Sequence, residues 1–572
     1  MKLTILALAG LGTCGVVLET TPKIPDGWNL VEQHVSPDQP LRLSLALREP
    51  NMRDLRSKIT CPSAARLSRD EAQALRVPDQ DDVDAVQEWL SSNGIAHTCQ
   101  ENDWIHVHTT VGKAEPLLEM KMHRYQYKNK DPVLRTREYS VPESLVDAIK
   151  FVHPIANFMA PKKELTRRSP AKRLHQRDAP CAGETTPECI RKLYNMPPVD
   201  PNATSSIRLG IAGFLEQYAN HGDVDLFLKH NAPEILAGGY NFTVELVNGG
   251  ENPQNLSRSG MEAALDMDYA MALGFPSNIT YYSTGGRGVG LNDNGEPLPE
   301  EFVDNEPYLE LLEYLLAKPD DEIPHVLSFS YADDELSVPK CYAEYVCSMF
   351  GILAARGTSV LVASGDGGAA GSRNSSCRTP EATDVTMAVF PASCPWVTGV
   401  GAVASESDPP RGAVFSGGGF SQYFPRESWQ DEFVDGYIQA LGGHLEGYYN
   451  GSMRATPDIS AIGADFQTIV GRKRVVLDGT SASTPVMAAM IALVNEERVK
   501  AGKEVLGWLN GKLYSKEVHE TLRDVTSGVS KSCDFEDEGK PGGWPAKEGW
   551  DAITGLGVPR DFQRFLRALV MA

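Results

Sequence analysis

Four short apolar segments constrain the fold of the second part of this chain. They are Arg208–Gly213, Val326–Ser330, Ser359–Ser364 and Trp396–Val400, and each ends at or beside glycine or serine. Runs of this kind, separated by segments with helical periodicity, are typical of buried strands in a parallel sheet. We therefore predict an α/β domain with a doubly wound parallel sheet that begins near Ile207. In such sheets the chemistry gathers at the carboxyl ends of the strands.

The first part of the chain is organised differently. Residues from about 22 to 160 combine strand-like stretches, Leu41–Leu47 and Trp104–Thr109, with a helical stretch, Asp81–Ser92. This pattern predicts a smaller α/β unit. The length of 572 residues agrees with two units, because a single hydrophobic core rarely exceeds about 250–300 residues.

A basic segment, residues 161–177, connects the two units. It contains the pairs Arg167-Arg168 and Lys172-Arg173 and lacks apolar periodicity, so we expect an exposed linker. Furin- and kexin-like proteases cut dibasic pairs of this kind; a merely solvated linker is the alternative. The order of the segments predicts a zymogen, with residues 19–177 as prodomain and linker and residues 178–572 as the mature domain.

The amino terminus predicts secretion to the extracellular space. Met1-Lys2 precedes an apolar run from Leu3 to Leu18, which is typical of a signal peptide. The run is shorter than the roughly 20 residues of a membrane-spanning helix, so we expect no membrane partner. We assign the signal to residues 1–18, with cleavage between about Gly15 and Thr21. The sequence also contains acceptor sequons for N-glycans, at Asn202, Asn241, Asn255, Asn278, Asn374 and Asn450.

The ten cysteines leave several pairings open. Cys181/Cys189 and Cys341/Cys347 are close enough in sequence for short-loop disulfides. Seven cysteines lie beyond the amino-terminal unit, and an odd number leaves one thiol. Cys394, which has apolar neighbours, is our candidate for a buried free thiol.

The formal net charge of −22 argues against nucleic-acid and anionic-membrane partners, since both require basic surfaces. Solubility explains the acidity on its own. A second interpretation is that a carboxylate-rich surface avoids a large positive charge in acid. Composition does not decide between the two.

Ser481 is the first candidate for chemistry. Gly479-Thr480-Ser481 leads into an apolar stretch that runs through Val494, which places Ser481 just before a buried helix or in its first turn. The N–H donors and the positive dipole end of a helix suit a developing oxyanion. The alternative is that Ser481 or Ser483 only caps the helix.

Acidic residues supply the other candidates. Glu262 and Asp266 lie four residues apart on one face of a predicted helix, where like charges mildly destabilise it. In the alternative account Ser259 and Glu262 form a capping box and Asp266 faces water. Asp268 lies on a different face and is not included. Asp366 follows a predicted strand, in a Ser-Gly-Asp-Gly turn that is structural by default.

Taken together and in order, these motifs resemble the sedolisins, the serine-carboxyl peptidases of subtilisin-like fold. The motifs are Glu262-x-x-x-Asp266, Ser364-Gly-Asp366-x-Gly, Phe390-Pro-Ala-Ser393 and Gly479-Thr-Ser481-x-x-x-Pro485. The resemblance runs from about Cys181 to the end of the chain, and Gly27–Glu32 is similar to the family's activation prodomain. Within the family, the likeness is to secreted fungal tripeptidyl-peptidases.

The resemblance implies a role for each candidate. Ser481 would be the nucleophile, Glu262 the general base, Asp266 its orienting partner, and Asp366 the side chain that donates to the oxyanion. It also implies that the enzyme releases tripeptides from polypeptides with a free amino terminus, and that the prodomain is an intramolecular inhibitor and chaperone. We expect a monomer after prodomain release.

These roles require acid. A histidine base with a pKa near 6.5 is protonated near pH 4, whereas a glutamate near 4.3 still accepts a proton. An aspartate donates to an oxyanion only when it is protonated. Asp366-Gly367 and Ser483-Thr484 depart from the usual family pattern without changing a catalytic group.

The carboxyl-terminal part is similar to the family's two calcium-binding segments. The resemblance assigns one structural Ca²⁺ to the carboxylates of Asp524 and Asp551 and to the carbonyls of Val525, Gly549 and Lys547, an oxygen set that suits this ion. Without the resemblance, Asp524–Gly528 reads as a turn. Cys377 and Cys533 occupy positions where some relatives have a disulfide.

Rival functions remain open at this point. His221-Gly-Asp223 is superficially similar to the histidine motif of a Ser-His-Asp subtilase, although the expected flanking motifs are missing. G-x-S-x-G and H-E-x-x-H are absent, which disfavours an α/β-hydrolase and a zinc peptidase. An acid endopeptidase of the same family is the nearest alternative. A secreted inactive homologue that acts as a binding protein is the alternative from another class.

Overall fold

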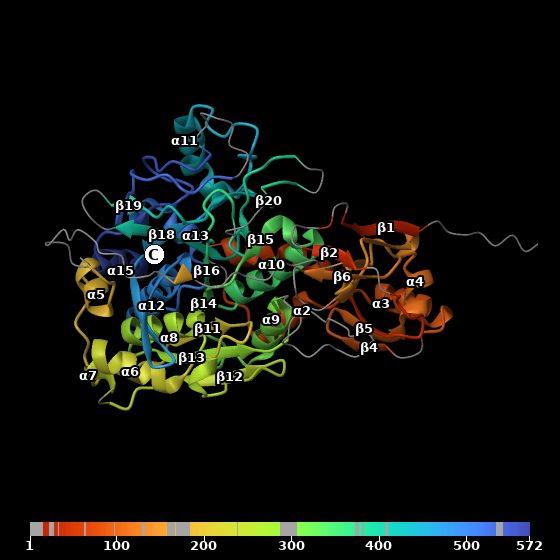
Figure 1. The fold of residues 1–572 in the computed structure, drawn as a ribbon, viewed down its shortest axis with the longest axis horizontal. Helices are drawn as coiled ribbons and strands as arrows, with labels where there is room; N and C mark the ends of the chain where they lie inside the picture. Colours follow the sequence, from red (N-terminus) through yellow and green to blue (C-terminus); the bar gives the residue numbers. More distant parts are fainter. Residues whose placement is uncertain are drawn as a thin grey trace, which may run out of the picture.

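The computed structural model describes residues 15–21, 24, 28–31, 34–61, 65–95, 98–127, 132–156, 166–167, 183–236, 238–286, 306–371, 377–379, 383–405, 410–533 and 542–572. These residues form a smaller amino-terminal unit and a larger second unit (Figure 1). The predicted boundary at residues 177/178 lies outside the described residues and stays a prediction.

An eight-stranded sheet forms the centre of the larger unit, in the order β12-β13-β11-β14-β16-β18-β19, with β22 also paired to β18. The strands are β11 (Arg208–Gly213), β12 (Thr243–Val247), β13 (Asn278–Thr284), β14 (Val326–Phe329), β16 (Ser359–Ala363), β18 (Thr398–Ser405), β19 (Arg411–Gly412) and β22 (Ile459–Ile462). All pairs are parallel except β18–β19. The predicted doubly wound parallel sheet is therefore confirmed.

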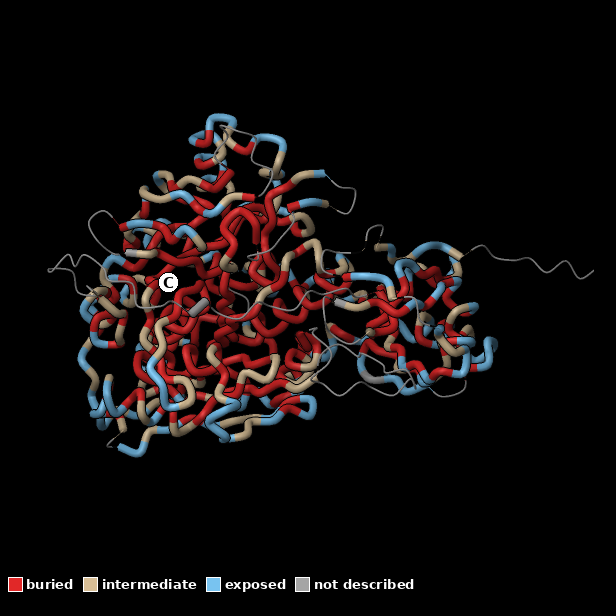
Figure 2. The backbone as a smooth tube through the Cα atoms, viewed as in Figure 1, coloured by how far each residue is buried: buried red, intermediate tan, exposed pale blue. Residues whose placement is uncertain are grey.

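The two faces of this sheet bury different helices. On one face lie α8 (Met261–Gly274) and α12 (Thr480–Lys500), and on the other lie α9 (Tyr308–Ala317) and α10 (Lys340–Ala355). Successive strand residues alternate between the two cores, as the two-residue period of a strand requires: Leu361 faces α8 and α12, while Val360 and Val362 face α9 and α10. In Figure 2 buried residues, drawn in red, are concentrated around this sheet.

Shorter elements complete the larger unit. Helices are α5 (Pro187–Leu193), α6 (His221–Asn231), α7 (Pro233–Leu236), α11 (Asp431–Leu441), α13 (Asn510–Leu513), α14 (Lys516–His519) and α15 (Phe562–Met571). Strands are β15 (Asp333–Asp334), β17 (Val389–Phe390), β20 (Gly419–Pro425), β21 (Met453–Thr456), β23 (Phe466–Val470), β24 (Lys473–Asp478), β25 (Leu522–Arg523) and β26 (Val558–Pro559). In the described part of the chain, no helix is both long and apolar enough to cross a bilayer.

The smaller unit is built on a four-stranded antiparallel sheet, β4-β5-β3-β9. These strands are β3 (Pro40–Leu47), β4 (Thr98–Glu101), β5 (Trp104–Thr110) and β9 (Ile149–His153), and α3 (Gln80–Ser92) covers their core. The other elements are α1 (Leu55–Thr60), α2 (Arg69–Leu75), α4 (Val111–Leu117), β2 (Trp28–Val31), β6 (His123–Tyr127), β7 (Val133–Arg135) and β8 (Glu138–Pro142). The predicted strands and the predicted helix are all present.

The end of the predicted signal segment forms structure with this unit. Strand β1 (Gly15–Thr20) pairs antiparallel with β8. Residues 1–14 lie outside the described part, and the cleavage point stays a prediction.

The two units meet along α9 and α10. Leu55 and Ile59 of α1 lie against Gly351 of α10, and the backbone N–H of Leu67 donates to the carbonyl of Ala355 at 3.0 Å. At the edge of the contact, the N–H of Arg69 donates to Asp320 Oδ2 at 3.1 Å.

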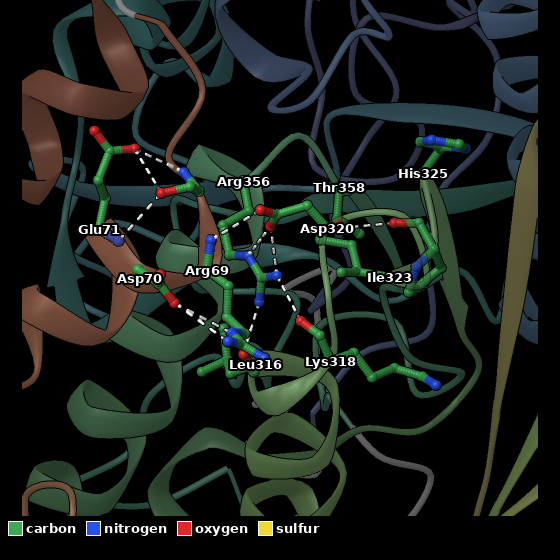
Figure 3. A network of polar contacts seen from close by, with 12 residues as sticks. Arg69, Asp70, Glu71, Leu316, Lys318, Asp320, Ile323, His325, Arg356 and Thr358 are labelled. Atoms are coloured by element: carbon green, nitrogen blue, oxygen red, sulfur yellow. Dashed lines mark hydrogen bonds and ion pairs between the residues drawn. The ribbon is translucent and has the colours of Figure 1, made fainter.

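The buried guanidinium of Arg356 orders the loop that receives Arg69. It contacts Asp320 Oδ1 at 2.7 Å and the carbonyls of Leu316 and Lys318 at 2.7 and 2.8 Å (Figure 3). The contact of the smaller unit at this edge is therefore made to a loop that the larger unit itself holds in place.

The disulfides correct two predictions. Cys347 is bonded to Cys394, with Cα atoms 5.5 Å apart, so Cys394 is not a free thiol and Cys341/Cys347 is not a pair. Among the described cysteines of the larger unit, Cys341 is a free thiol. Cys341 and Cys347 are both on α10, where a six-residue separation corresponds to a rise of about 9 Å, too far for a disulfide.

Two further cysteine predictions have different outcomes. The Cys377–Cys533 disulfide implied by the family resemblance is present. Cys189 is disulfide-bonded, while Cys181 lies outside the described residues.

Candidate active site

Helix α8 brings the two carboxylates of the first motif into the interior. The helix begins at Met261 with Gly260 as its N-cap and has no side-chain cap, so the capping box of the alternative account is absent. Glu262 is 5% exposed and Asp266 is 1% exposed. Asp266 therefore does not face water, and both side chains lie under the site.

Ser481 is in the first turn of α12, whose N-cap is Gly479. Its Oγ lies 3.4 Å from the carbonyl oxygen of Ser330, the residue that follows β14. The hydroxyl of Ser483 instead donates to the carbonyls of Ala461 and Ile462, both at 3.1 Å. Neither serine caps the helix, which contradicts the alternative reading of this segment.

Ser330 connects the nucleophile candidate with α8. Its hydroxyl donates to Asp266 Oδ1 at 2.8 Å, while its carbonyl accepts from Ser481. Ser330, Asp266 and Ser481 are all buried. The carboxyl end of β14 therefore places Ser481 and Asp266 on two sides of one residue, as expected for a parallel sheet whose chemistry lies at the strand ends.

Asp366 reaches the same place from the next strand along the sheet, β16. Gly365 has φ +95°, a left-handed conformation that favours glycine, and turns the chain toward α12. Asp366 Oδ1 accepts hydrogen bonds from the N–H of Thr480 at 2.8 Å and from its hydroxyl at 3.0 Å. Asp366 is thus bound to the residue immediately before Ser481.

Two buried tyrosines, Tyr281 and Tyr331, lie near the carboxylates of α8 and interact with them electrostatically. Burial, and secondarily the charges of Asp266 and Glu262, raise the pKa of Tyr281 well above its usual value. Burial, and further the neighbouring Tyr281 and the same two carboxylates, raise the pKa of Tyr331 in the same direction. Both phenols are therefore neutral, and their hydroxyls donate to the backbone carbonyls of Gln217 and Phe214.

Sequence reasoning missed Ser330, Thr480 and Gln217. Gln217 Oε1 accepts from the backbone N–H of Glu262 at 3.0 Å and so fixes the first turn of α8. For Ser330 a signal existed, because it ends a predicted strand of a parallel sheet. Nothing in the sequence near Gln217 indicates its contact with a helix 45 residues away.

His221, the histidine of the rival subtilase reading, lies at the start of α6 with contacts of another kind. Its ring stacks on Phe242 at 4.0 Å and its Nδ1 is 3.1 Å from Asn241 Oδ1. Asp223 is buried and accepts from the N–H groups of Gly471 and Arg472 at 2.7 and 2.8 Å. These contacts are those of structural residues.

The predicted calcium segments come together around two carboxylates. Asp524 Oδ2 accepts from the N–H of Gly549 at 2.7 Å, while its buried Oδ1 has no hydrogen-bond partner among the described residues. Asp551 is fully buried and accepts from the N–H groups of Ile553 and Thr554, both at 2.9 Å.

The electrostatics of these segments suit a cation. Burial, and further the charge of Asp524, raise the pKa of Asp551 to about 7 against its hydrogen bonds. A group of three or more His, Cys, Asp and Glu side chains that could hold a metal does not occur in the described residues. A cation here would therefore depend on two carboxylates and backbone carbonyls, a donor set that fits Ca²⁺.

Part of the predicted linker lies beside the strand that leads to Ser481. Strand β10 (Thr166–Arg167) pairs antiparallel with β24, Thr166 opposite Asp478 and Arg167 opposite Leu477. The pairs Arg167-Arg168 and Lys172-Arg173 otherwise fall outside the described residues.

Family models match parts of both units of the chain. Residues 26–158 match "Pro-kumamolisin, activation domain", and residues 312–526 match "Subtilase family". Among solved structures, the chain is similar to Pseudomonas sedolisin, a serine-carboxyl proteinase, complexed with pseudo-iodotyrostatin. The identity is 18% and the TM-score 0.48, over 66% of this chain and 96% of that chain.

Relatives extend over nearly the whole chain. "Probable tripeptidyl-peptidase SED3" of Arthroderma benhamiae is 35% identical over 97% of this chain and 95% of its own length. "Tripeptidyl-peptidase SED2" of Arthroderma otae is 36% identical over 97% and 96%, and "Tripeptidyl-peptidase sed4" of Aspergillus fumigatus is 35% identical over 99% and 98%. With an activation domain, a subtilase-type domain and relatives of this extent, the chain belongs to the sedolisin family of serine-type peptidases, together with these fungal proteins.

Proposed function

We propose that this protein is a secreted peptidase that works in acid and releases tripeptides from the free amino terminus of polypeptides. The observation that carries the proposal is the linkage through Ser330, which contacts Ser481 with its carbonyl and Asp266 with its hydroxyl. Glu262 lies one helical turn from Asp266 on the same face of α8. The names of the relatives support the tripeptidyl mode.

In the proposed reaction Glu262 accepts the proton of the Ser481 hydroxyl as its oxygen attacks the scissile carbonyl carbon. Asp266 orients Glu262, and a protonated Asp366 donates to the oxyanion of the tetrahedral intermediate. Collapse of the intermediate breaks the C–N bond, and Glu262 returns the proton to the leaving amine. Water then hydrolyses the acyl-enzyme by the same route and regenerates Ser481.

The choice of carboxyl groups accounts for the proposed pH range. A glutamate remains a usable base near pH 4, where a histidine is protonated, and an aspartate donates only in its acid form. Activity should therefore peak in acid and fall toward neutrality.

The first test is the pH–rate profile of the secreted protein on a peptide with a free amino terminus, with products identified by mass spectrometry. We expect an acid optimum, tripeptides as first products, and loss of about 10⁴-fold or more in kcat for Ser481→Ala and Glu262→Ala. His221→Ala is the matched control and should retain activity.

Each alternative gives a different result. A neutral optimum with active Glu262→Ala and inactive His221→Ala would assign a Ser-His-Asp subtilase. Cleavage of an amino-terminally acetylated peptide at internal bonds would assign an endopeptidase. A well-folded wild type that neither cleaves peptides nor reacts with a fluorophosphonate in acid would be the inactive binding protein.

Three features support secretion of a zymogen. Cys347–Cys394 and Cys377–Cys533 are disulfides, which persist in oxidising compartments. Five of the six sequon asparagines lie in the described part, and all five are exposed. The linker strand β10 pairs with β24, the strand that ends at Asp478, shortly before Ser481. We propose that the prodomain inhibits the enzyme until the linker is cut, and that the released domain is a monomer, which size-exclusion chromatography would test.

We also propose one structural Ca²⁺, held by Asp524, Asp551 and the carbonyls of Val525, Gly549 and Lys547. The bound ion would supply positive charge to two buried carboxylates and take no part in the reaction. A ligand at 100 times its Kd stabilises the folded protein by about 2.7 kcal/mol. Chelation should therefore lower Tm by several degrees, reversed by Ca²⁺ but not by Mg²⁺, and Asp524→Asn should abolish the response. An unchanged Tm would contradict the site.

A further inference from the structure

Helix α8 contains a third buried carboxyl group that the proposed reaction does not use. Asp268 is fully buried and lies two residues after Asp266, so it points to a different side of the helix. Its Oδ2 accepts hydrogen bonds from the hydroxyl of Thr468 and from the N–H of Ile469 at 3.2 Å. Both partners belong to β23.

Strand β23 is the first half of a hairpin that ends at the nucleophile. It pairs antiparallel with β24 from Phe466/Leu477 to Val470/Lys473. The N–H of Gly479 donates to the carbonyl of Gly463 at 3.0 Å, and Ser481 follows two residues later. The position of this hairpin thus bears directly on where α12 begins.

The same hairpin is held at two other points. Tyr269, next to Asp268, donates its hydroxyl to the carbonyl of Gln467 at 2.9 Å. Asp223 of α6 accepts from the N–H groups of the turn, Gly471 and Arg472. Asp268 therefore acts at the middle of β23, between contacts at its start and at its turn.

We propose that Asp268 is a positioning residue of this peptidase, which keeps the α8 carboxylates in register with the hairpin that places Ser481. The inference rests on the catalytic roles proposed above for Ser481, Glu262 and Asp266. Asp268 itself is not expected to touch the substrate.

The surroundings of Asp268 favour a neutral carboxyl. Its Oδ1 has no hydrogen-bond partner among the described residues, and its two partners on β23 are uncharged. Among the groups near it, Asp223 adds negative charge from α6 and lies 3.7 Å from Arg472. Tyr269 is a buried phenol near Glu184. An ionised carboxylate in such surroundings would lack compensation.

Burial is the largest cause that raises the pKa of Asp268, the charge of Asp223 adds to it, and the hydrogen bonds to Thr468 and Ile469 oppose it. A raised folded pKa means that the folded protein binds the proton more tightly than the unfolded chain does. This contribution to stability is present below the unfolded pKa and is lost as the pH rises through the folded pKa. The contribution of Asp268 to the stability of the folded protein is therefore largest in acid.

The test compares Asp268→Asn, Asp268→Ala and Thr468→Val with wild type in the processed protein. Asparagine reproduces a neutral carboxyl, so Asp268→Asn should keep kcat within about threefold in acid and lose activity more slowly at pH 7 than wild type. Asp268→Ala should lower kcat by about tenfold or more with KM changed less than about twofold, because it displaces the catalytic groups rather than the substrate. Thr468→Val should fall between them.

Asp225→Asn, the same substitution at an exposed position of α6, is the control. Wild-type kcat in Asp268→Ala would overturn the inference, and so would an Asp268→Asn variant as impaired as Asp268→Ala, which would show that the charge is needed. If Asp268→Ala is not secreted, the kcat values of Asp268→Asn and Thr468→Val test the inference. Near-wild-type kcat in Asp268→Asn with a lower kcat in Thr468→Val supports it, and wild-type kcat in Thr468→Val overturns it.

A separate measurement distinguishes failure of the proposed function from failure of this inference. If wild type has no Ser481-dependent activity in acid, the proposed function is wrong, and Tm between pH 4 and 7 tests the contact alone. A smaller decline of Tm in Asp268→Asn than in wild type supports the neutral contact, and equal declines refute it.

Discussion

Carboxyl groups are paired differently at the prodomain interface and beneath the candidate active site. At the interface, arginines neutralise them: Arg76 contacts Asp103 at 2.6 Å and Glu313 at 2.7 Å, and Arg56 contacts Glu427 at 2.6 Å. Beneath the site, carboxyl groups accept hydrogen bonds from neutral hydroxyl donors.

The region around the site gives several examples of this second kind. Asp266 accepts from Ser330, Asp268 from Thr468, and Asp333 from the hydroxyl of Tyr308 at 2.8 Å. The Tyr308 hydroxyl also contacts Glu306, whose carboxyl raises the pKa of Asp333 in addition to burial. Here protonation is accommodated, whereas at the interface it would remove one member of an ion pair.

The comparison shows that acid acts in opposite directions on Asp320 at the interface and on the buried Asp333 near the site. At the interface, hydrogen bonds from Arg356 and from the N–H of Arg69 outweigh burial at Asp320 and lower its pKa. Such a carboxylate contributes stability above its unfolded pKa, and that contribution disappears as the pH falls through the folded value. Burial instead raises the pKa of Glu427 despite its contact with Arg56. A buried carboxyl with a raised pKa contributes stability below its unfolded pKa and loses it as the pH rises. Acidification should therefore weaken the prodomain contact at Asp320 while the buried carboxyls of the catalytic domain keep their packing.

Arg76→Ala should have the largest effect on this comparison. Arg76, which is 4% exposed, joins the fully buried Asp103 of its own unit to Glu313 of α9 across the interface, and removing one partner of a buried ion pair costs about 3–5 kcal/mol. We expect prodomain docking to weaken at neutral pH, so that processing begins at a higher pH than in wild type. Gel analysis of processing against pH would measure this.

Arg48→Ala is the matched control for Arg76→Ala. It breaks the ion pair between Arg48 and Asp82, which lies within the prodomain. The side chain of Arg48 is 38% exposed and that of Asp82 is 19% exposed. An unchanged processing pH in Arg76→Ala, or an equal shift in both variants, would contradict the interface argument.

Asp366 tests the site half of the comparison. Loss of one oxyanion donor costs about 10²–10³-fold in kcat, or 2.7–4 kcal/mol, so we expect this loss for Asp366→Ala. Asp366→Asn supplies an N–H donor at every pH and should retain more activity than Asp366→Ala, especially at the upper end of the pH range. Stopped assays from pH 3 to 7 would separate them. Activity of Asp366→Ala within about threefold of wild type would remove Asp366 from the reaction.

Much of the fold was predictable because local patterns determine it. The apolar run Arg208–Gly213 is strand β11 without change, and Ser359–Ser364 exceeds β16 by one residue. The predicted fourth run begins at Trp396, but β18 begins at Thr398, since Val397 N–H bonds to Cys394 in a turn. Strand periodicity does not register such a turn.

The parts that could not be predicted depend on contacts distant in sequence. Asp268 was set aside because it lies off the face of Glu262 and Asp266, yet α8 is buried on every side, so each face has a partner. Cys394 has the apolar neighbours of a free thiol, but its partner lies on α10. Helical geometry, applied to Cys341 and Cys347, would have excluded that pair.

Asp333→Asn should give a moderate effect within the catalytic domain. Burial is the main cause that raises the pKa of Asp333, so wild type loses stability as the pH rises above about 4, at up to about 1.4 kcal/mol per pH unit for one proton. The amide does not titrate and should reduce this slope. Tm of the processed domain from pH 4 to 7 measures it, with Asp225→Asn as control. Parallel Tm curves for wild type and Asp333→Asn would contradict the assignment.

Asp320→Asn should have the smallest effect on prodomain docking, and the pKa of Asp320 fixes the direction in which that effect changes with pH. Partial burial raises the pKa of Asp320, but hydrogen bonds from Arg356 and from the N–H of Arg69 outweigh it and lower the pKa overall. Its side chain is 52% exposed, so solvent screening limits its contribution to about 0.2–1 kcal/mol. That contribution exists only where Asp320 is ionised.

The asparagine variant should therefore weaken prodomain docking at pH 6 and weaken it less at pH 3, because the contribution of wild-type Asp320 declines as the pH falls below its unfolded pKa. Processing should shift in the direction of Arg76→Ala but by less, and half-times at the two pH values would measure it. Because Arg356 keeps its contacts to the carbonyls of Leu316 and Lys318, the loop should stay ordered in the variant. An effect at pH 3 as large as that at pH 6 would mean that Asp320 acts through its shape rather than its charge, and the interface would then not sense acid at this position.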